Sequence, residues 1–169
     1  MRIQTKEYEV YTLDEVLEKA IERQWDINVD YEWWGTVHDD AEMVGIKIDS
    51  FDIDRASYCN INVPGCAETA HLIMDNHGTR CDTYKLAEQF LADRDKLIDT
   101  AEKDEDGKFV DLYELDGKLD DIESEFIQAL SEEYRIMLQH EYEYLTSAEA
   151  IEETLRANDY EFYADGSIA

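Results

Sequence analysis

The residues most able to do chemistry lie between Ala101 and Phe126, where eleven positions are Asp or Glu and three are Lys. An EF-hand calcium loop places Gly at position 6, Asp at position 1 and a bidentate Glu at position 12. With Gly107 at position 6, Glu102 stands at position 1 and Tyr113 at position 12. Two required ligand types are missing, so we expect no calcium site.

A second group of potential metal ligands is Cys59, Cys66, His71, His77 and Cys81, which fall within 23 residues. Structural zinc sites pair their ligands at C-x₂₋₄-C or H-x₃₋₅-H spacing. His71 and His77 come closest, but six residues of helix rotate by about 600°, which directs the two side chains to different sides. We expect no zinc site, no metal and no other cofactor. Three cysteines without a signal peptide are typical of reduced thiols in the cytosol.

Catalytic motifs are absent from the sequence. It contains no G-x-S-x-G, P-loop, H-E-x-x-H or G-x-G-x-x-G pattern. Asp52 and Asp54 would share one face of a strand, as in some metal-dependent nucleases, but a nuclease needs basic groups to meet phosphate. Such spacings also arise by chance among 43 acidic residues. We expect that the protein is not an enzyme.

The charge of the chain is extreme, with 15 basic and 43 acidic residues and a formal net charge of −28. A small domain needs a net charge of only about 2–8 for solubility. Asp116/Asp120 and Asp121/Glu125 are like-charge pairs at i, i+4 in a predicted helix, and each pair costs about 0.2–0.5 kcal/mol. Charge that costs stability favours a basic partner over a merely solvated face. The predicted partner-binding residues, which would mimic phosphates, are Asp104, Glu105, Asp106, Asp116, Asp120, Asp121, Glu123 and Glu125.

The elements that position these residues follow from hydrophobic periodicity and from capping residues. Capping boxes at Thr12–Glu15 and Thr146–Glu149 predict two helices, the first with an apolar face from Leu13 to Ile21 and the second continuing to about residue 157. Strands are expected at 2–11, 46–54, 56–63 and 160–163, with a bulge in the second. Further helices are expected at 30–44, 66–77, about 82–101, where Asp82 or Thr83 would cap, and from about Leu119 past Met137.

The absence of βαβ alternation predicts an α+β fold, in which a small, mostly antiparallel sheet is covered by helices and a long acidic helix lies in the C-terminal half. A length of 169 residues favours one domain. Within it we expect an α+β half at 1–97, an acidic helical segment at 98–146 and a closing helix and strand at 147–169. Trp25, Trp33 and Trp34 are expected in the core, with an aromatic platform for a partner as the alternative.

Three segments resemble a family of small acidic proteins encoded by bacteriophages and prophages, some of which carry an antitoxin label. They are YEVYTLDEVLEKAIERQWDINVDYEWW (8–34), SFDIDRASYC (50–59) and NDYEFYADGS (158–167), about a quarter of the chain. The resemblance implies a phage context, in which small acidic proteins imitate DNA to block host enzymes. It transfers no functional residues.

We therefore expect a phage-derived inhibitor of a host nucleic-acid-binding defence system, of the anti-CRISPR or anti-restriction kind, that acts as a DNA mimic in the host cytoplasm. Its partner would be a basic nucleic-acid-binding host protein or complex, without direct binding to nucleic acid or membrane. The inhibitor itself would be a monomer or small homo-oligomer. The alternatives are an antitoxin-like protein that neutralises a basic toxin, and an acidic phage accessory protein without a defence role.

Overall fold

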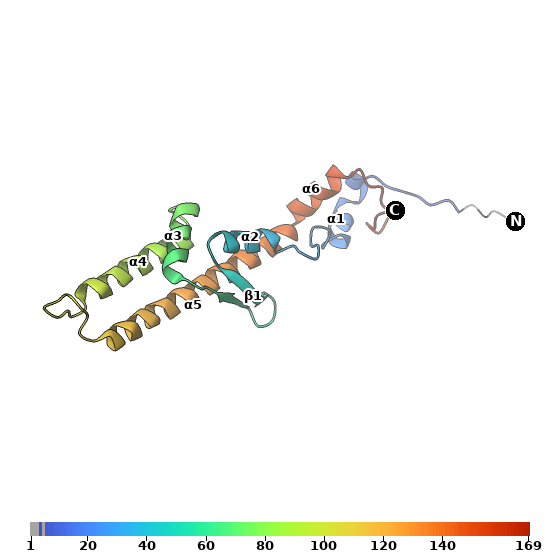
Figure 1. The fold of residues 1–169 in the computed structure, drawn as a ribbon. Helices are drawn as coiled ribbons and strands as arrows, with labels where there is room; N and C mark the ends of the chain where they lie inside the picture. The colour runs from blue at the N-terminus through green and yellow to red at the C-terminus, as the bar shows by residue number, and fades with distance from the viewer. Residues whose placement is uncertain (1–3, 5) are drawn as a thin grey trace. The chain divides into compact units, whose positions relative to one another are not determined.

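The computed structural model describes residue 4 and residues 6–169 and confirms the α+β class (Figure 1). The two strands, β1 (Lys47–Asp52) and β2 (Tyr58–Asn62), form an antiparallel hairpin. The helices within the described residues are α1 (Leu13–Arg23), α2 (Gly35–Met43), α3 (Cys66–Asn76), α4 (Asp82–Thr100), α5 (Leu112–Leu145) and α6 (Ala148–Ala157).

The chain forms two compact units. The terminal unit comprises the chain up to Trp34 together with His140–Ala169, and the central unit comprises Gly35–Gln139. The boundary near residue 140 falls inside α5, and it differs from the boundaries at 98 and 147 expected from the sequence. The single domain stays a prediction.

The terminal unit is built around α1 and α6. Its buried core consists of Val16, Ala20, Ile151, Leu155 and Phe162. The capping box at the start of α1 is confirmed, because the Thr12 backbone N–H donates to the Glu15 carboxylate at 2.8 Å. The C-terminal turn packs tightly on α1: Gly166 has φ +84°, and a Cβ at this position would overlap the Lys19 backbone. Only glycine fits that approach.

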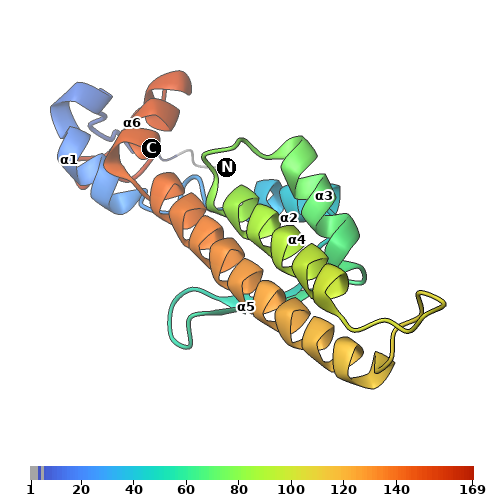
Figure 2. The same cartoon turned by 90° about the vertical axis from the view of Figure 1, so that its left-hand side faces the viewer.

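The central unit contains an αα-hairpin of α4 and α5, which lie side by side in both views (Figures 1 and 2). Phe90 of α4 and Phe126 of α5 stack with ring centroids 4.4 Å apart. The β-hairpin is tied to α5, since the Ser131 hydroxyl donates to the Cys59 carbonyl at 2.7 Å. The predicted bulge is confirmed by a register shift between Ile48 and Ser50.

Two predicted strands are wrong where the structure describes them. Of segment 2–11, residues 2, 3 and 5 lie outside the described residues, and only Tyr11 pairs, in a single bridge to Phe162. Segment 160–163 likewise contributes only Phe162, which also pairs with Ile168. Alternating side chains favour an extended backbone, but a strand also needs a partner strand of matching length. These two segments pair only through the single bridges.

Several helix boundaries also differ from prediction. Residues 31–34 form turns before α2, and α5 begins seven residues before Leu119. The N-cap of α4 is Cys81, because the hydroxyl of Thr83 lies 2.6 Å from His77 Nδ1 inside the fold. In α6 the capping oxygen belongs to Ser147, which accepts from the Ala150 N–H at 3.2 Å.

The tryptophans are less buried than a core position requires. Trp25 is 52% exposed, and Trp33 and Trp34 are half-buried, so the core prediction is wrong for Trp25. Trp33 packs against Trp34 and Tyr142 with centroids 5.8 and 5.3 Å away.

No helix in the described part of the chain is long and apolar enough to cross a membrane.

Candidate partner-binding surface

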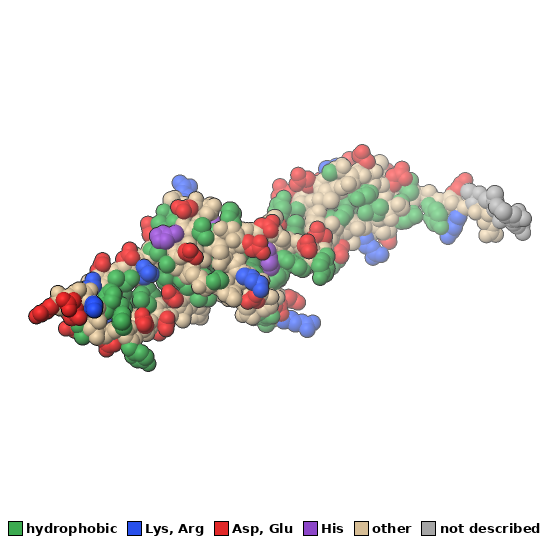
Figure 3. Space-filling view, in the orientation of Figure 1, with side chains coloured by type: hydrophobic (Ala, Val, Ile, Leu, Met, Phe, Trp, Pro, Cys, Tyr) green, Lys and Arg blue, Asp and Glu red, His purple; other side chains and the backbone are tan. Residues whose placement is uncertain are grey.

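The eight predicted phosphate-mimicking residues all lie in the central unit. Asp104, Glu105 and Asp106 belong to the loop between α4 and α5, and the other five belong to the first half of α5. Seven of the eight are exposed, and Glu123 is half-buried. In Figure 3 acidic side chains crowd the end of the central unit at which α4 connects to α5. The eight residues thus lie in and beside the turn that closes the helical hairpin, and their role in binding a partner stays a prediction.

The five carboxylates on α5 do not form a single face. At 100° per residue, Asp116 and Asp120 lie about 40° apart on one flank of the helix. Asp121 and Glu125 lie equally close together on another flank, about 140° around the axis from the first pair. Glu123 lies about 20° from Asp116 around the axis and is half-buried, and its charge is, after burial, the second cause that raises the pKa of Cys66 to about 11. The outward charge of α5 is thus two parallel stripes.

The eight carboxylates lack ion-pair partners within the described part of the chain. Among the described residues, none of the eight forms an ion pair with a Lys or Arg side chain within 4.0 Å. The nearby Lys118 pairs instead with Glu114, at 2.6 Å between Nζ and Oε1. The two stripes are therefore exposed negative charge without an internal partner, as a surface for a cationic ligand requires.

Asp104 differs from the rest because it also builds the loop. Its Oδ1 accepts from the backbone N–H groups of Asp106, at 3.0 Å, and Lys108, at 2.9 Å. The turn closes around Gly107, which has φ +76°. A substitution at Asp104 would therefore disturb the loop as well as the charge, whereas the stripe residues can be changed without loss of a hydrogen bond.

The most buried titratable cluster lies inside the central unit. Asp40 of α2 accepts from the Tyr134 hydroxyl of α5 at 2.8 Å, and its other oxygen lies 3.3 Å from Nε2 of His77. This second contact is electrostatic, since Nε2 has no aligned hydrogen-bond partner. It is the main reason why the pKa of Asp40 is lowered, with the Tyr134 hydrogen bond as a smaller cause.

The order Thr83, His77, Asp40 resembles the nucleophile, base and acid of a hydrolase. However, Thr83 is only 5% exposed, so its hydroxyl cannot reach a substrate. The cluster instead joins α2, α4 and α5 to the residue after α3. Its members are far apart in the sequence, and only the motif of a buried Tyr on the core face of a helix could have suggested it.

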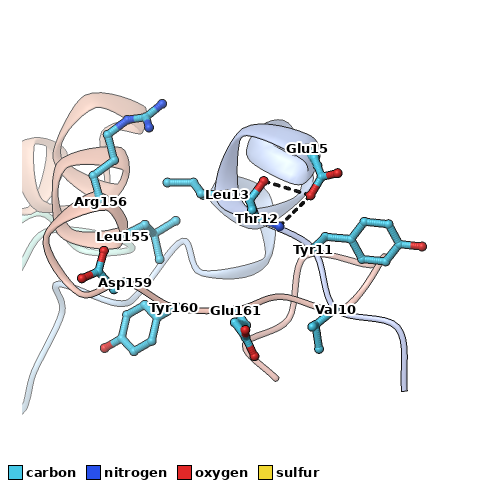
Figure 4. Close-up of a pocket in the computed structure, with 10 residues that line it drawn as sticks. All are labelled: Val10, Tyr11, Thr12, Leu13, Glu15, Leu155, Arg156, Asp159, Tyr160 and Glu161. Atoms are coloured by element: carbon cyan, nitrogen blue, oxygen red, sulfur yellow. Dashed lines mark hydrogen bonds between the residues drawn. The ribbon is translucent and has the colours of Figure 1, made fainter. Parts of the chain in front are cut away.

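A cavity of about 440 Å³ lies in the terminal unit (Figure 4). Two of its four charged lining residues, Glu15 and Arg156, are already used by the fold, whereas Asp159 and Glu161 are exposed carboxylates. Glu15 belongs to the capping box, and Arg156 forms ion pairs with Asp14 and Glu152 at 3.0 and 2.8 Å. The one basic side chain of the cavity is therefore held by the fold, and the charge left unpaired there is acidic.

Among the described residues, no three His, Cys, Asp or Glu side chains are placed to hold a metal ion. Cys59 and Cys66 are buried thiols, and burial raises the pKa of each to about 11. Asp52 and Asp54 do not form a paired site, because Asp52 accepts from the Asp54 and Arg55 backbone in a turn.

Sequence reasoning missed three apolar residues at the acidic end of the hairpin. Val110, Leu112 and Tyr113 are 57%, 57% and 91% exposed. The signal was available, since these large apolar residues interrupt the acidic run just before the expected periodicity begins.

No protein-family model, curated protein or solved structure matches this chain.

Proposed function

We propose that the protein is a phage-derived, non-enzymatic inhibitor of a host nucleic-acid-binding defence protein, and that its α5 stripes occupy the partner's DNA-binding groove. The observation that carries this proposal is the pair of exposed stripes, Asp116/Asp120 and Asp121/Glu125, with no compensating cation among the described residues. Like charges held one helical turn apart lower stability. Cations of a basic partner would offset that repulsion by attracting the carboxylates.

The charge density of α5 supports mimicry of DNA. Residues 112–125 contain six carboxylates over about 21 Å of helix, or one per ~3.5 Å. One strand of B-DNA carries one charge per 3.4 Å of axis. The Glu114–Lys118 ion pair removes one of the six and leaves one per ~4 Å. A groove lined with Lys and Arg would therefore meet a field of similar strength along this helix.

Long-range attraction would also bring the partner to this surface. The net charge of −28 steers a basic protein toward the inhibitor, as it steers such a protein to DNA. The same charge repels nucleic acid, so the protein would act on the partner rather than on its substrate. Inhibition would require no catalytic residue.

The proposal is tested by expressing the protein in bacteria that carry a restriction or CRISPR nuclease and transforming them with a plasmid that the nuclease recognises. Inhibition should raise the transformation efficiency at least tenfold for one nuclease in the panel. The immobilised protein should retain that nuclease until the salt concentration is raised, and duplex DNA should displace it.

Other outcomes identify the competing functions. Retention of a single small basic protein that does not bind DNA, with relief of its toxicity, would identify an antitoxin-like protein. Unchanged transformation across the panel, with no partner that is released by salt, would contradict an anti-defence role and leave the accessory protein as the explanation.

A further inference from the structure

The end of the helical hairpin combines exposed apolar side chains with dense negative charge. The α4–α5 tip, defined as residues 101–114, contains six acidic residues and two lysines. Val110, Leu112 and Tyr113 lie within it and are each more than half exposed. In Figure 3 hydrophobic side chains stand among the acidic ones at this end of the central unit. Soluble proteins rarely keep clustered large apolar residues exposed unless the patch binds something.

The tip is an ordered structure rather than a loose loop. Lys103 and Phe109 pair in an antiparallel bridge, and the Val110 N–H donates to the Glu102 carbonyl at 2.9 Å. Asp111 caps α5 by accepting from the Glu114 N–H at 2.9 Å. The apolar residues are therefore held in place before binding, which lowers the entropy cost of association.

Tyr113 is the apolar residue of the tip that the fold covers least. Leu112 and Tyr113 occupy the first two positions of α5, while Leu115, one turn further, is the first residue of the helix to be buried. Tyr113, at 91% exposure, has no hydrogen bond or ring contact among the described residues. The packing of the hairpin thus leaves Tyr113 almost wholly uncovered and covers less than half of Val110 and Leu112.

We propose that the tip is the anchor of the interface with the basic partner, and that Tyr113, with Leu112 and Val110 beside it, inserts into an apolar pocket surrounded by Lys and Arg. This inference rests on the proposed function for the class of partner, and it names the contact. Protein interfaces commonly place an aromatic hot spot at the centre and charged groups at the rim. The charge around Tyr113 selects a cationic rim on the partner.

The probe for the test is the purified nucleic-acid-binding protein that the immobilised chain retains and that duplex DNA displaces. Its affinity is measured for the wild type, for Tyr113→Ala and for the matched control Tyr31→Ala at low and moderate NaCl. Tyr31 is 87% exposed and belongs to the terminal unit. Tyr113→Ala should weaken binding at least tenfold at both salt concentrations, and Tyr31→Ala by less than twofold.

The salt dependence of the affinity distinguishes the apolar contact of Tyr113 from the charged contacts of the α5 stripes. An apolar contact is not screened by ions, so Tyr113→Ala should leave the dependence of affinity on salt unchanged. Reversal of the α5 stripes should instead weaken that dependence. Because Tyr113 is exposed, the melting temperature of Tyr113→Ala should match the wild type and exclude misfolding as the cause.

Three outcomes overturn the anchor. The first is unchanged affinity in Tyr113→Ala, while stripe reversal still abolishes binding; the proposed function then stands without this contact. The second is an equal loss in Tyr31→Ala, which would move the interface to the aromatic residues of the terminal unit. The third is the absence of any partner displaced by DNA, which contradicts the proposed function together with the anchor.

Discussion

Residue-scale chemistry in the central unit centres on Asp40, which holds the Tyr134 hydroxyl and faces His77. Tyr134 is fully buried, so Tyr134→Phe removes one hydrogen bond with little change in volume and leaves an Asp40 oxygen short of a donor. We expect a loss of about 1–2 kcal/mol in the free energy of unfolding, measured by urea denaturation. Tyr113→Phe, at an exposed hydroxyl, should lose nothing measurable. Equal stabilities for both variants would contradict the hydrogen bond.

The same carboxylate predicts a pH dependence. The folded-state pKa of Asp40 lies below its ordinary 3.8, mainly because of His77. Ionised Asp40 therefore stabilises the fold above the unfolded-state pKa, and this contribution is lost as the pH falls through the folded pKa. The difference in unfolding free energy between the wild type and Asp40→Asn should shrink as the pH falls from 5 to below about 4. A difference that grows in acid would contradict the assignment.

The thiols should differ sharply in reactivity. Burial raises the pKa of Cys59 and Cys66 to about 11, so almost no thiolate forms at either position at pH 8. Cys81 is exposed. Brief treatment of the native protein with iodoacetamide at pH 8 should add one label, located by mass spectrometry on Cys81, whereas the denatured protein should take three. Rapid labelling of Cys66 in the native protein would contradict its burial.

At the scale of elements, two glycines make opposite predictions. Gly166→Ala places a Cβ against the Lys19 backbone at a φ of +84°, and should cost at least ~2 kcal/mol of unfolding free energy. Gly117 lies inside α5 with open space around it, so Gly117→Ala should stabilise by about 0.5–1 kcal/mol. Thermal unfolding of the two variants measures both changes in stability, a loss for Gly166→Ala and a gain for Gly117→Ala. A tolerated Gly166→Ala would show that the C-terminal turn does not pack on α1.

Elements with a local signal were predictable from the sequence, and elements that depend on distant partners were not. The Thr12–Glu15 capping box and the bulge between Ile48 and Ser50 depend on residues close together in the sequence, and both were predicted. The strand at 160–163 failed because its length is set by pairing with Tyr11, about 150 residues away. For the same reason the Asp40–Tyr134 contact was missed, since its two residues are 94 positions apart.

At the scale of the whole molecule, the net charge of −28 dominates. Intramolecular repulsion opposes folding, and added salt screens it over about 10 Å at 0.1 M. The melting temperature should therefore rise between 10 and 200 mM NaCl. A neutral osmolyte at matched osmolarity controls for general solvent effects and should reproduce little of the rise. A flat or falling melting temperature would show that repulsion does not limit stability.

Placement of charge, rather than its total, is the central claim, and the chain offers a matched comparison. One variant reverses the α5 stripes by Asp116→Lys, Asp120→Lys, Asp121→Lys and Glu125→Lys. The other reverses four exposed carboxylates of the terminal unit by Glu18→Lys, Glu22→Lys, Glu153→Lys and Glu161→Lys. Each change of four charges by +2 takes the net charge from −28 to about −20 at neutral pH.

The most direct measurement is the displacement of labelled duplex DNA from the retained partner by the wild type and by these two variants. The terminal-unit variant should displace DNA within about threefold of the wild-type concentration, because long-range steering falls only slightly. The α5 variant should require at least a hundredfold more, because its lysines would face the partner's own cations. Equal displacement by the two variants would contradict the account, since binding would then follow net charge alone and not the stripes on α5.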